Sequence, residues 1–315
     1  MDNRRSGGRA PAYFRSNGGV VRYGELLERG LTAADVRRLV RSGDLIPIRR
    51  GCYAWRRDDL TPEARHLLLL EATRPTLGVG TVFTHGSAAV LHDLPVRITD
   101  LTRVHITRPD TSGRITKNVW RHSAPLPDSA VTEASGVPVT TIERTVVDLA
   151  RWLPFADAVA VVDAALHRGV ERAALEAEIE LARRRRFNER ARRAVAFGDA
   201  RAESPGESRS RVLMAVVGLP MPQLQREFRD HNGEVDARVD FDWEEYGVSG
   251  EFDGEVKYGR LLAPGETVDK VVVFEKQREE LLKTHGRWTV RWVNANLSNT
   301  SRRSQETLTF CVKFP

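Results

Sequence analysis

Acidic residues gather in one segment of the chain, at spacings that could place several carboxylates together. Residues 234–255 contain nine acidic residues and a single arginine, which gives this segment a net charge of −8. Glu251 and Asp253 lie two residues apart in a predicted strand, so both side chains point to one face of a sheet. Like charges on one face repel each other without a countercharge. We therefore expect a cation or a basic side chain beside this pair.

Two further acids and one lysine complete this candidate site. Asp240 falls in the preceding predicted strand, Glu207 falls on the helix before the strands, and Lys257 follows four residues after Asp253. Hard oxygen ligands on one face suit Mg²⁺, which can activate water and stabilise a reacting phosphate. The predicted metal ligands are Asp240, Glu251, Asp253 and Glu207, and the predicted catalytic residues are Asp240, Glu251, Asp253 and Lys257. Two simpler interpretations compete, because Glu207 also fits a helix-capping box and Asp240 also fits a solvated strand face.

The elements that must position these acids follow from hydrophobic periodicity and from the breaks between periodic segments. They are a helix over 205–217, strands over 223–228, 237–243 and 248–253, a helix over 269–284 and a strand over 288–293. This order, with the acids at 207, 240, 251 and 253, resembles the Vsr-like branch of the PD-(D/E)XK superfamily over about residues 204–297. The resemblance implies a restriction-endonuclease-like fold and, as an alternative function, a metal-dependent DNA endonuclease. That superfamily usually carries a lysine where this chain has Asp253, which favours binding over cleavage.

The beginning of the chain has the opposite charge. The first 60 residues contain thirteen arginines and seven acids, and the whole chain carries a net charge of +6. A basic segment favours an anionic partner, most often nucleic acid. The pattern predicts helices over 23–29 and 33–41, joined by a glycine-containing turn, and a hairpin with strands over 45–50 and 52–55. Two helices followed by a basic hairpin are the plan of a winged helix-turn-helix domain.

Five arginines of this domain are predicted to contact duplex DNA. Arg37, Arg38 and Arg41 fall on the polar face of the second helix, which would enter the major groove. Arg49 and Arg50 fall in the hairpin, where they would pair with phosphates. The alternative is that the three helical arginines form a solvated helix face.

Several short motifs in the first half of the chain occur in a characteristic order. They are Gly30-Leu31-Thr32, Arg41-Ser42-Gly43-Asp44-Leu45, Arg49-Arg50-Gly51-Cys52-Tyr53, Thr84-His85-Gly86-Ser87-Ala88-Ala89 and Glu143-Arg144-Thr145-Val146-Val147-Asp148-Leu149-Ala150. In this order they resemble the AbiEi family over about residues 15–170. The resemblance implies an antitoxin of a type IV toxin–antitoxin system that represses its own operon, with duplex DNA and a cognate toxin as partners.

The region between these two sites is predicted to be scaffold. Leu149 and Leu166 fall on the apolar faces of two packed helices over 142–153 and 155–166. The histidines match no metal-ligand spacing. A run of four arginines at 183–186 suits the end of a helix, and a nucleic-acid contact is its alternative interpretation.

Composition limits the remaining possibilities. The 315 residues are 41% hydrophobic and 29% charged, which suits a folded chain of several domains. No apolar stretch of about 18 residues is present, so no membrane-spanning helix is expected. The N-terminus does not resemble a secretory signal, and two cysteines exclude a disulfide scaffold. These features favour a cytoplasmic protein.

We expect an α+β multidomain protein with a winged helix-turn-helix domain at 1–58, a mixed α/β region at 59–200 and an endonuclease-like αβββαβ domain at 201–315. The favoured function is a DNA-binding regulator that resembles antitoxins. The alternatives are a Mg²⁺-dependent endonuclease that the winged helix delivers to duplex DNA, and an interaction protein whose C-terminal domain holds a toxin.

Overall fold

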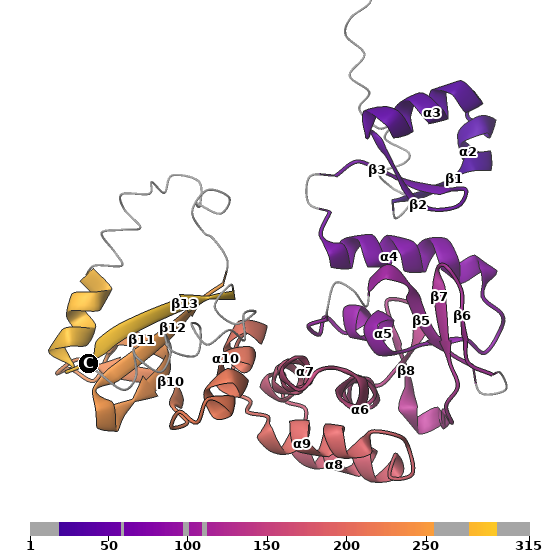
Figure 1. Cartoon of the computed structure of the whole chain (residues 1–315). Coiled ribbons are helices and arrows are strands. Elements are labelled where there is room, and N and C mark those ends of the chain that lie inside the picture. Colours follow the sequence, from indigo (N-terminus) through magenta and orange to yellow (C-terminus); the bar gives the residue numbers. More distant parts are fainter. Residues whose placement is uncertain (1–18, 58–59, 97–100, 109–111, 255–276, 295–315) are drawn as a thin grey trace, which may run out of the picture. The chain divides into compact units, whose positions relative to one another are not determined.

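The computed structural model describes residues 19–57, 60–96, 101–108, 112–254 and 277–294 (Figure 1). These residues form a mixed α+β structure. The chain divides into two compact units, Met1–Thr145 and Val146–Pro315. None of the helices in the described ranges is both long enough and apolar enough to cross a membrane. The predicted domain limits at 58 and 200 stay predictions.

The first unit begins with the two predicted helices and the predicted hairpin, to which an additional strand, β1, is paired in a small antiparallel sheet. Its elements are β1 (Val20–Arg22), α2 (Tyr23–Glu28), α3 (Ala33–Ser42), β2 (Leu45–Arg49) and β3 (Cys52–Trp55), with strand order β1-β3-β2. Thr32 caps α3, because its hydroxyl accepts a hydrogen bond from the Asp35 amide at 3.2 Å. Leu26 is fully buried. The next residue, Leu27, is 40% exposed, since neighbouring helical residues point about 100° apart.

The rest of the first unit is a six-stranded mixed sheet covered by two helices. Its helices are α4 (Pro62–Thr73) and α5 (His85–Leu91). Its strands, in sheet order, are β6 (Arg114–Ile115), β7 (Val119–His122), β5 (Val104–Thr107), β4 (Val82–Phe83), β9 (Val137–Thr140) and β8 (Val131–Ala134). Leu69 and Leu70 of α4 share one core with Phe83 and Ile106 of the sheet. Strands β5 and β7 pair in parallel.

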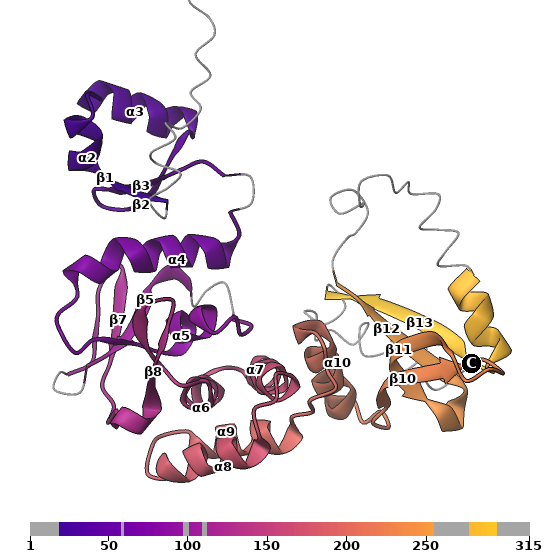
Figure 2. The same ribbon diagram turned by 180° about the vertical axis from the view of Figure 1, so that it is seen from behind.

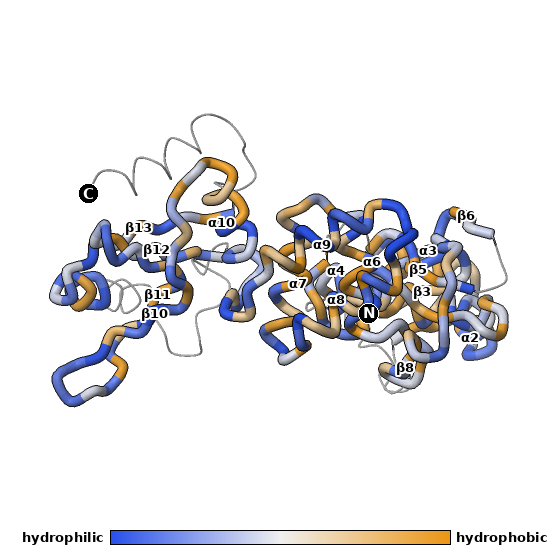
Figure 3. Tube along the Cα trace, turned by 90° about the horizontal axis from the view of Figure 1, so that it is seen from below, coloured by the Kyte–Doolittle hydropathy of each residue, from blue (hydrophilic) through white to orange (hydrophobic). Residues whose placement is uncertain are grey.

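Five helices begin the second unit or lead into it. They are α6 (Ile142–Trp152), α7 (Phe155–His167), α8 (Arg172–Leu181), α9 (Asn188–Phe197) and α10 (Pro205–Val216). The apolar residues of α7 colour most of its length orange in Figure 3, and almost all of them are buried. Leu149 on α6 and Leu166 on α7 are buried, as predicted.

A four-stranded sheet follows α10. Its strands β10 (Gln223–Arg229), β11 (Val235–Trp243), β12 (Val248–Asp253) and β13 (Trp288–Val293) are neighbours in chain order. The first three strands are antiparallel, and β13 runs parallel to β12. A helix precedes β13 and is described over 277–284. The first part of the predicted helix, 269–276, lies outside the described residues.

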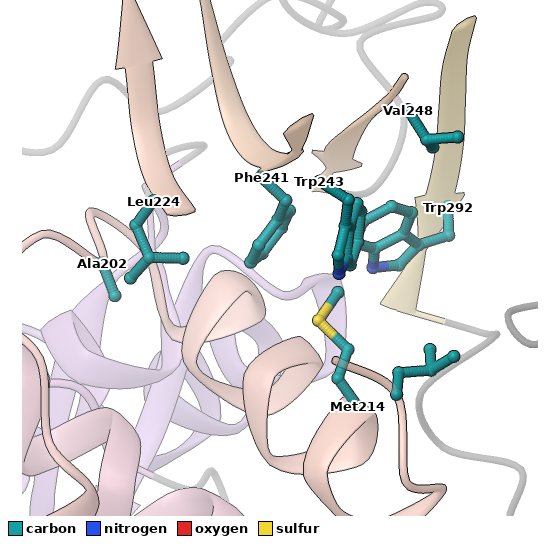
Figure 4. Packing of buried hydrophobic residues seen from close by; sticks show 8 residues of the cluster. Ala202, Met214, Leu224, Phe241, Trp243, Val248 and Trp292 are labelled. Atoms are coloured by element: carbon teal, nitrogen blue, oxygen red, sulfur yellow. The ribbon is translucent and has the colours of Figure 1, made fainter. Parts of the chain in front are cut away.

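Helix α10 lies alongside this sheet in both views (Figure 1 and Figure 2). Met214 of α10 is fully buried and lies beside the rings of Trp243 and Trp292, as Figure 4 shows. At the other end of the β10–β11 hairpin, Phe228 and Leu282 share a second core. The sheet is therefore fixed at one end by α10 and at the other end by the helix at 277–284.

Helix α10 is also fixed to α7 by a buried ion pair. The Arg211 guanidinium lies 2.8 Å from an Asp163 oxygen, and the two side chains are 6% and 1% exposed. The same guanidinium donates to the Phe197 carbonyl at 2.9 Å, and the second Asp163 oxygen accepts from the Asp199 amide at 2.7 Å. Each charge thus has both an ionic partner and a further hydrogen bond, which a buried pair requires.

We predict that Arg211→Met destabilises the second unit by about 3–5 kcal/mol, because it leaves the Asp163 carboxylate buried without its countercharge. Arg183→Met is the matched control, since Arg183 pairs with Glu180 on the protein surface. That change should cost less than about 1 kcal/mol. Denaturant midpoints followed by tryptophan fluorescence measure both effects. Equal losses in the two variants would contradict the prediction.

Candidate functional site

The arginines predicted on the second helix are presented as the sequence analysis expected. Arg37, Arg38 and Arg41 are exposed on α3, and Val36 of the same helix is buried in the small core. Arg38 lies 2.7 Å from an Asp35 oxygen, yet its side chain remains 71% exposed. The helix therefore offers three accessible guanidinium groups on one side and is anchored on the other.

The two hairpin arginines differ from each other, which corrects part of the prediction. Arg50 is exposed beside the tight turn, where Gly51 has a φ of +73°. Arg49 donates instead to the Ala72 carbonyl at 3.3 Å and to the Thr76 hydroxyl at 3.2 Å. In return, Arg65 of α4 donates to the Pro47 carbonyl at 3.0 Å. Arg49 therefore fastens the hairpin to the neighbouring helix and is not presented for a phosphate.

The carboxylate cluster of the second unit depends on a close contact between α10 and β12. Gly206 lies in the first turn of α10, and a Cβ atom there would overlap the ring of Phe252 on β12. This contact buries the next residue, Glu207. One Glu207 oxygen accepts hydrogen bonds of 3.0 Å from the Glu203 amide and from the Gln225 side chain. Ser204 caps the helix as expected, since its hydroxyl accepts from the Glu207 amide at 3.2 Å.

Asp240 lies close enough to Glu207 and Glu251 to interact with both. One oxygen of Asp240 accepts a hydrogen bond of 2.8 Å from the Phe252 amide. This hydrogen bond lowers the pKa of Asp240. Burial, together with repulsion from the carboxylates of Glu207 and Glu251, outweighs it and raises the pKa to about 6. The structure thus brings three of the predicted acids together and gives one of them an unusual affinity for a proton.

Two arginines face the third acid. Glu251 accepts a hydrogen bond of 2.8 Å from Arg291 of β13, and its other oxygen lies 2.7 Å from Arg278. This contact set does not fit a divalent cation, because both Glu251 oxygens face guanidinium groups. In the part of the chain that the structure describes, no three His, Cys, Asp or Glu side chains are grouped so that they could hold a metal ion.

The predicted metal ligands Glu207, Asp240, Glu251 and Asp253 are therefore not assembled as a metal site in the described residues. Asp253 is half-buried on β12 and follows the strand alternation from Glu251. Lys257 lies outside the described residues. Catalysis by Asp240, Glu251, Asp253 and Lys257 stays a prediction.

Three histidines that spacing did not connect lie together in the first unit. The rings of His85 and His122 stack with centroids 3.7 Å apart, and His105 Nδ1 lies 3.1 Å from His122 Nε2. The parallel pairing of β5 with β7 brings His105 and His122 together, and the start of α5 adds His85. His105 and His122 are 17 residues apart, so only the pairing of β5 with β7 could have revealed that these histidines lie together.

Comparison with known families matches two models to this chain. Residues 9–54 match a family described as "Transcriptional regulator, AbiEi antitoxin". Residues 78–196 match a family described as "AbiEi antitoxin C-terminal domain". The first match covers the described winged-helix elements up to β3, and the second runs from the strands of the six-stranded sheet through α9.

Proteins of Mycobacterium tuberculosis are similar to most of the chain. Two proteins named as uncharacterized, MT2308 and Rv2248 from two strains, are each 30% identical over 254 residues, which is 76% of this chain and 90% of theirs. Among solved structures, the RV2827C protein of the same organism matches 70% of this chain and 90% of its own, with 19% identity and a TM-score of 0.39.

We predict that the Asp240 carboxyl makes stability depend on pH. The unfolded chain loses this proton near pH 4 and the folded protein keeps it until about pH 6, so the unfolding free energy falls as pH rises through this window. The rise in pKa from 3.8 to about 6 corresponds to roughly 3 kcal/mol. The Asp240→Asn variant should lack this dependence of the unfolding free energy on pH. Denaturant titrations between pH 4 and 7 compare the two proteins, and parallel profiles would show that Asp240 does not titrate in this range.

Proposed function

We propose that this protein is a DNA-binding transcriptional regulator of a toxin–antitoxin system, because residues 9–54 and 78–196 match AbiEi antitoxin families. The observation that carries this proposal is the exposed arginine face of α3, in a region whose two helices and three-stranded antiparallel sheet are compatible with a winged helix. In such domains the second helix enters the major groove. Arg37, Arg38 and Arg41 would then reach base edges or nearby phosphates, and Arg50 would contact the backbone from the hairpin.

Charge supports the same assignment. Duplex DNA carries a dense line of phosphates, and each phosphate contact made by arginine releases condensed counterions. The first 60 residues, with a net charge of +6, offer this contact, whereas residues 234–255 repel phosphate. We propose duplex DNA as the partner of the first unit. The match to antitoxin families supports a cognate toxin as the target whose effect the protein counteracts.

The C-terminal region, which we propose as a domain at 201–315, is best explained as a restriction-endonuclease-like fold used for binding. The order of α10, three antiparallel strands, a helix and a parallel fourth strand supports this fold. Two arginines on Glu251, and an aspartate where that superfamily usually has lysine, favour binding over cleavage. A cytoplasmic location also stays a prediction.

The DNA-binding proposal is tested with the full-length protein and a fluorescent duplex taken from the region upstream of its own gene. Changing Arg37, Arg38 and Arg41 together to Gln should weaken binding by about tenfold or more, and should lower the slope of log affinity against log salt by up to about 3. The matched control changes Arg74, Arg114 and Lys117 to Gln, which removes the same charge from exposed positions of the same unit.

Two further variants separate the hairpin arginines. Arg50→Gln should weaken DNA binding with little loss of stability, because its side chain is exposed. Arg49→Gln should lower the melting temperature, because it removes the hydrogen bonds to α4 and the turn after it. If the α3 variant binds as tightly as the control variant, the proposed recognition helix is wrong.

A further inference from the structure

We propose that the second unit carries a separate binding site for single-stranded nucleic acid, formed by Trp152, Phe187 and the arginines beside them. Trp152 ends α6, and Phe187 lies immediately before α9. In this site an unpaired base stacks on the aromatic pair, and arginines contact the neighbouring phosphates. The proposal is independent of the duplex contact assigned to α3.

The aromatic pair is exposed although it belongs to a well-packed helical unit. Trp152 is 52% exposed and Phe187 is 38% exposed, while their ring centroids lie 5.0 Å apart in an edge-to-face arrangement. Leaving two large rings in water forfeits the free energy that their burial would give. Exposed aromatic side chains next to each other therefore indicate a surface that another molecule covers.

The backbone at Phe187 is strained, and this strain serves to present the ring. Phe187 has a φ of 63° and a ψ of 18°, in the left-handed region that bulky residues rarely adopt. Two contacts hold it there. The Arg151 guanidinium donates to the Arg186 carbonyl at 3.0 and 2.9 Å, and the Asn188 side chain donates to the Ile179 carbonyl at 2.9 Å. Strain that its surroundings enforce in this way is typical of functional sites.

A buried charge network supports these contacts from below. Arg151 and Asp148 on α6 are 6% and 3% exposed, and they are joined by a hydrogen bond of 3.0 Å. Arg185 reaches the same Asp148 oxygen at 3.1 Å. The segment is thus tied to α6 at residues 185 and 186, immediately before Phe187. Of the arginine run at 183–186, Arg185 is thus held by the fold, while Arg183, Arg184 and Arg186 remain exposed.

The rim of the aromatic pair is strongly basic. Residues 183–193 contain seven arginines and one acid. Within the residues that the structure describes, Arg184, Arg186 and Arg190 have no acidic partner, whereas Arg183 and Arg192 pair with glutamates of the neighbouring turns. The guanidinium carbon of Arg190 lies 4.6 Å from the centre of the Phe187 ring, and that of Arg186 lies at 5.9 Å. Arg186 and Arg190 therefore lie beside the Phe187 ring, and Arg184 adds a further cation in the same run.

Exposed aromatic rings with arginines beside them match the chemistry of a single strand. Unpaired bases stack on aromatic rings, and guanidinium groups bind the phosphates on either side. A duplex keeps its bases stacked inside, so it cannot use the rings. An acidic protein segment could satisfy the arginines, but the repeating charge of a phosphodiester chain fits a dense run of guanidinium groups better.

The test uses the full-length protein with labelled single strands of about 15 nucleotides, oligo-dT and oligo-U, and a duplex of similar length. Trp152→Leu and Phe187→Asn should each weaken binding of a single strand by about tenfold and leave duplex binding within about twofold. The two oligomers distinguish DNA from RNA as the source of the strand. Trp288→Leu is the matched control, because Trp288 is a 62% exposed tryptophan elsewhere in the same unit.

The melting temperature gives a second readout, which distinguishes a Phe187 ring presented for binding from one that packs in the fold. Asparagine tolerates the left-handed conformation, so Phe187→Asn should keep or raise the melting temperature while it weakens binding. A clear fall in melting temperature would show that Phe187 is a packing residue and would overturn the proposal.

Charge gives a third readout. Changing Arg184, Arg186 and Arg190 together to Gln should lower the salt dependence of single-strand binding by about 2 in the logarithmic slope. The control variant changes Arg183 and Arg192, which each pair with a glutamate, together to Gln. The α3 triple variant should retain single-strand binding, which keeps this test distinct from the duplex proposal. If the ring variants bind single strands as the wild type does, the proposal is wrong and a protein partner becomes the explanation for the patch.

Discussion

The buried ion pair between Asp163 and Arg211 determines how the second unit is built. Removing two charges from water is costly, and the cost is offset only when each charge meets its partner in good geometry. Here the pair fixes one side of α10 to α7, and Met214 on the same helix packs into the core of the C-terminal sheet. A single helix therefore belongs to two layers, so the sheet and the helical layer are held by one shared element.

The same helix begins at the carboxylate cluster, so the electrostatics of that cluster depend on how α10 is seated. Glu207, in the first turn, lies near enough to raise the pKa of Asp240. Arg291 and Arg278 compensate Glu251 from the last strand and the helix before it. Two arginines from the C-terminal part of the chain thus neutralise Glu251, and the parallel pairing of β12 with β13 places Arg291 opposite it.

Local patterns were enough to predict the elements that carry strong periodicity or caps. Helix α3, with Thr32 at its start, and the order of elements from α10 to β13 follow from such signals. The short strands β4 and β6 have only two residues each, which is too few for any pattern to register.

Side-chain partners were harder to predict than elements, because they are set by tertiary contacts between distant residues. Arg49 seemed equivalent to Arg50 in the sequence, yet its acceptor lies 23 residues further along the chain. Glu251 and Arg291 are 40 residues apart. The strained conformation of Phe187 likewise has no signature in its own residue type. Sequence reasoning therefore located the acids and arginines but could not assign which of them neutralise one another.

Gly206 shows how the shape of a backbone can govern acid–base chemistry. Because this residue has no Cβ, the first turn of α10 can rest directly on the ring of Phe252. Glu207 follows Gly206 in this turn, so the close packing brings its carboxylate to the sheet that carries Asp240. The proton affinity of Asp240 is therefore tuned by the absence of a methyl group on a residue that bears no charge. A purely steric change at position 206 would therefore alter the pKa of Asp240 on the neighbouring strand.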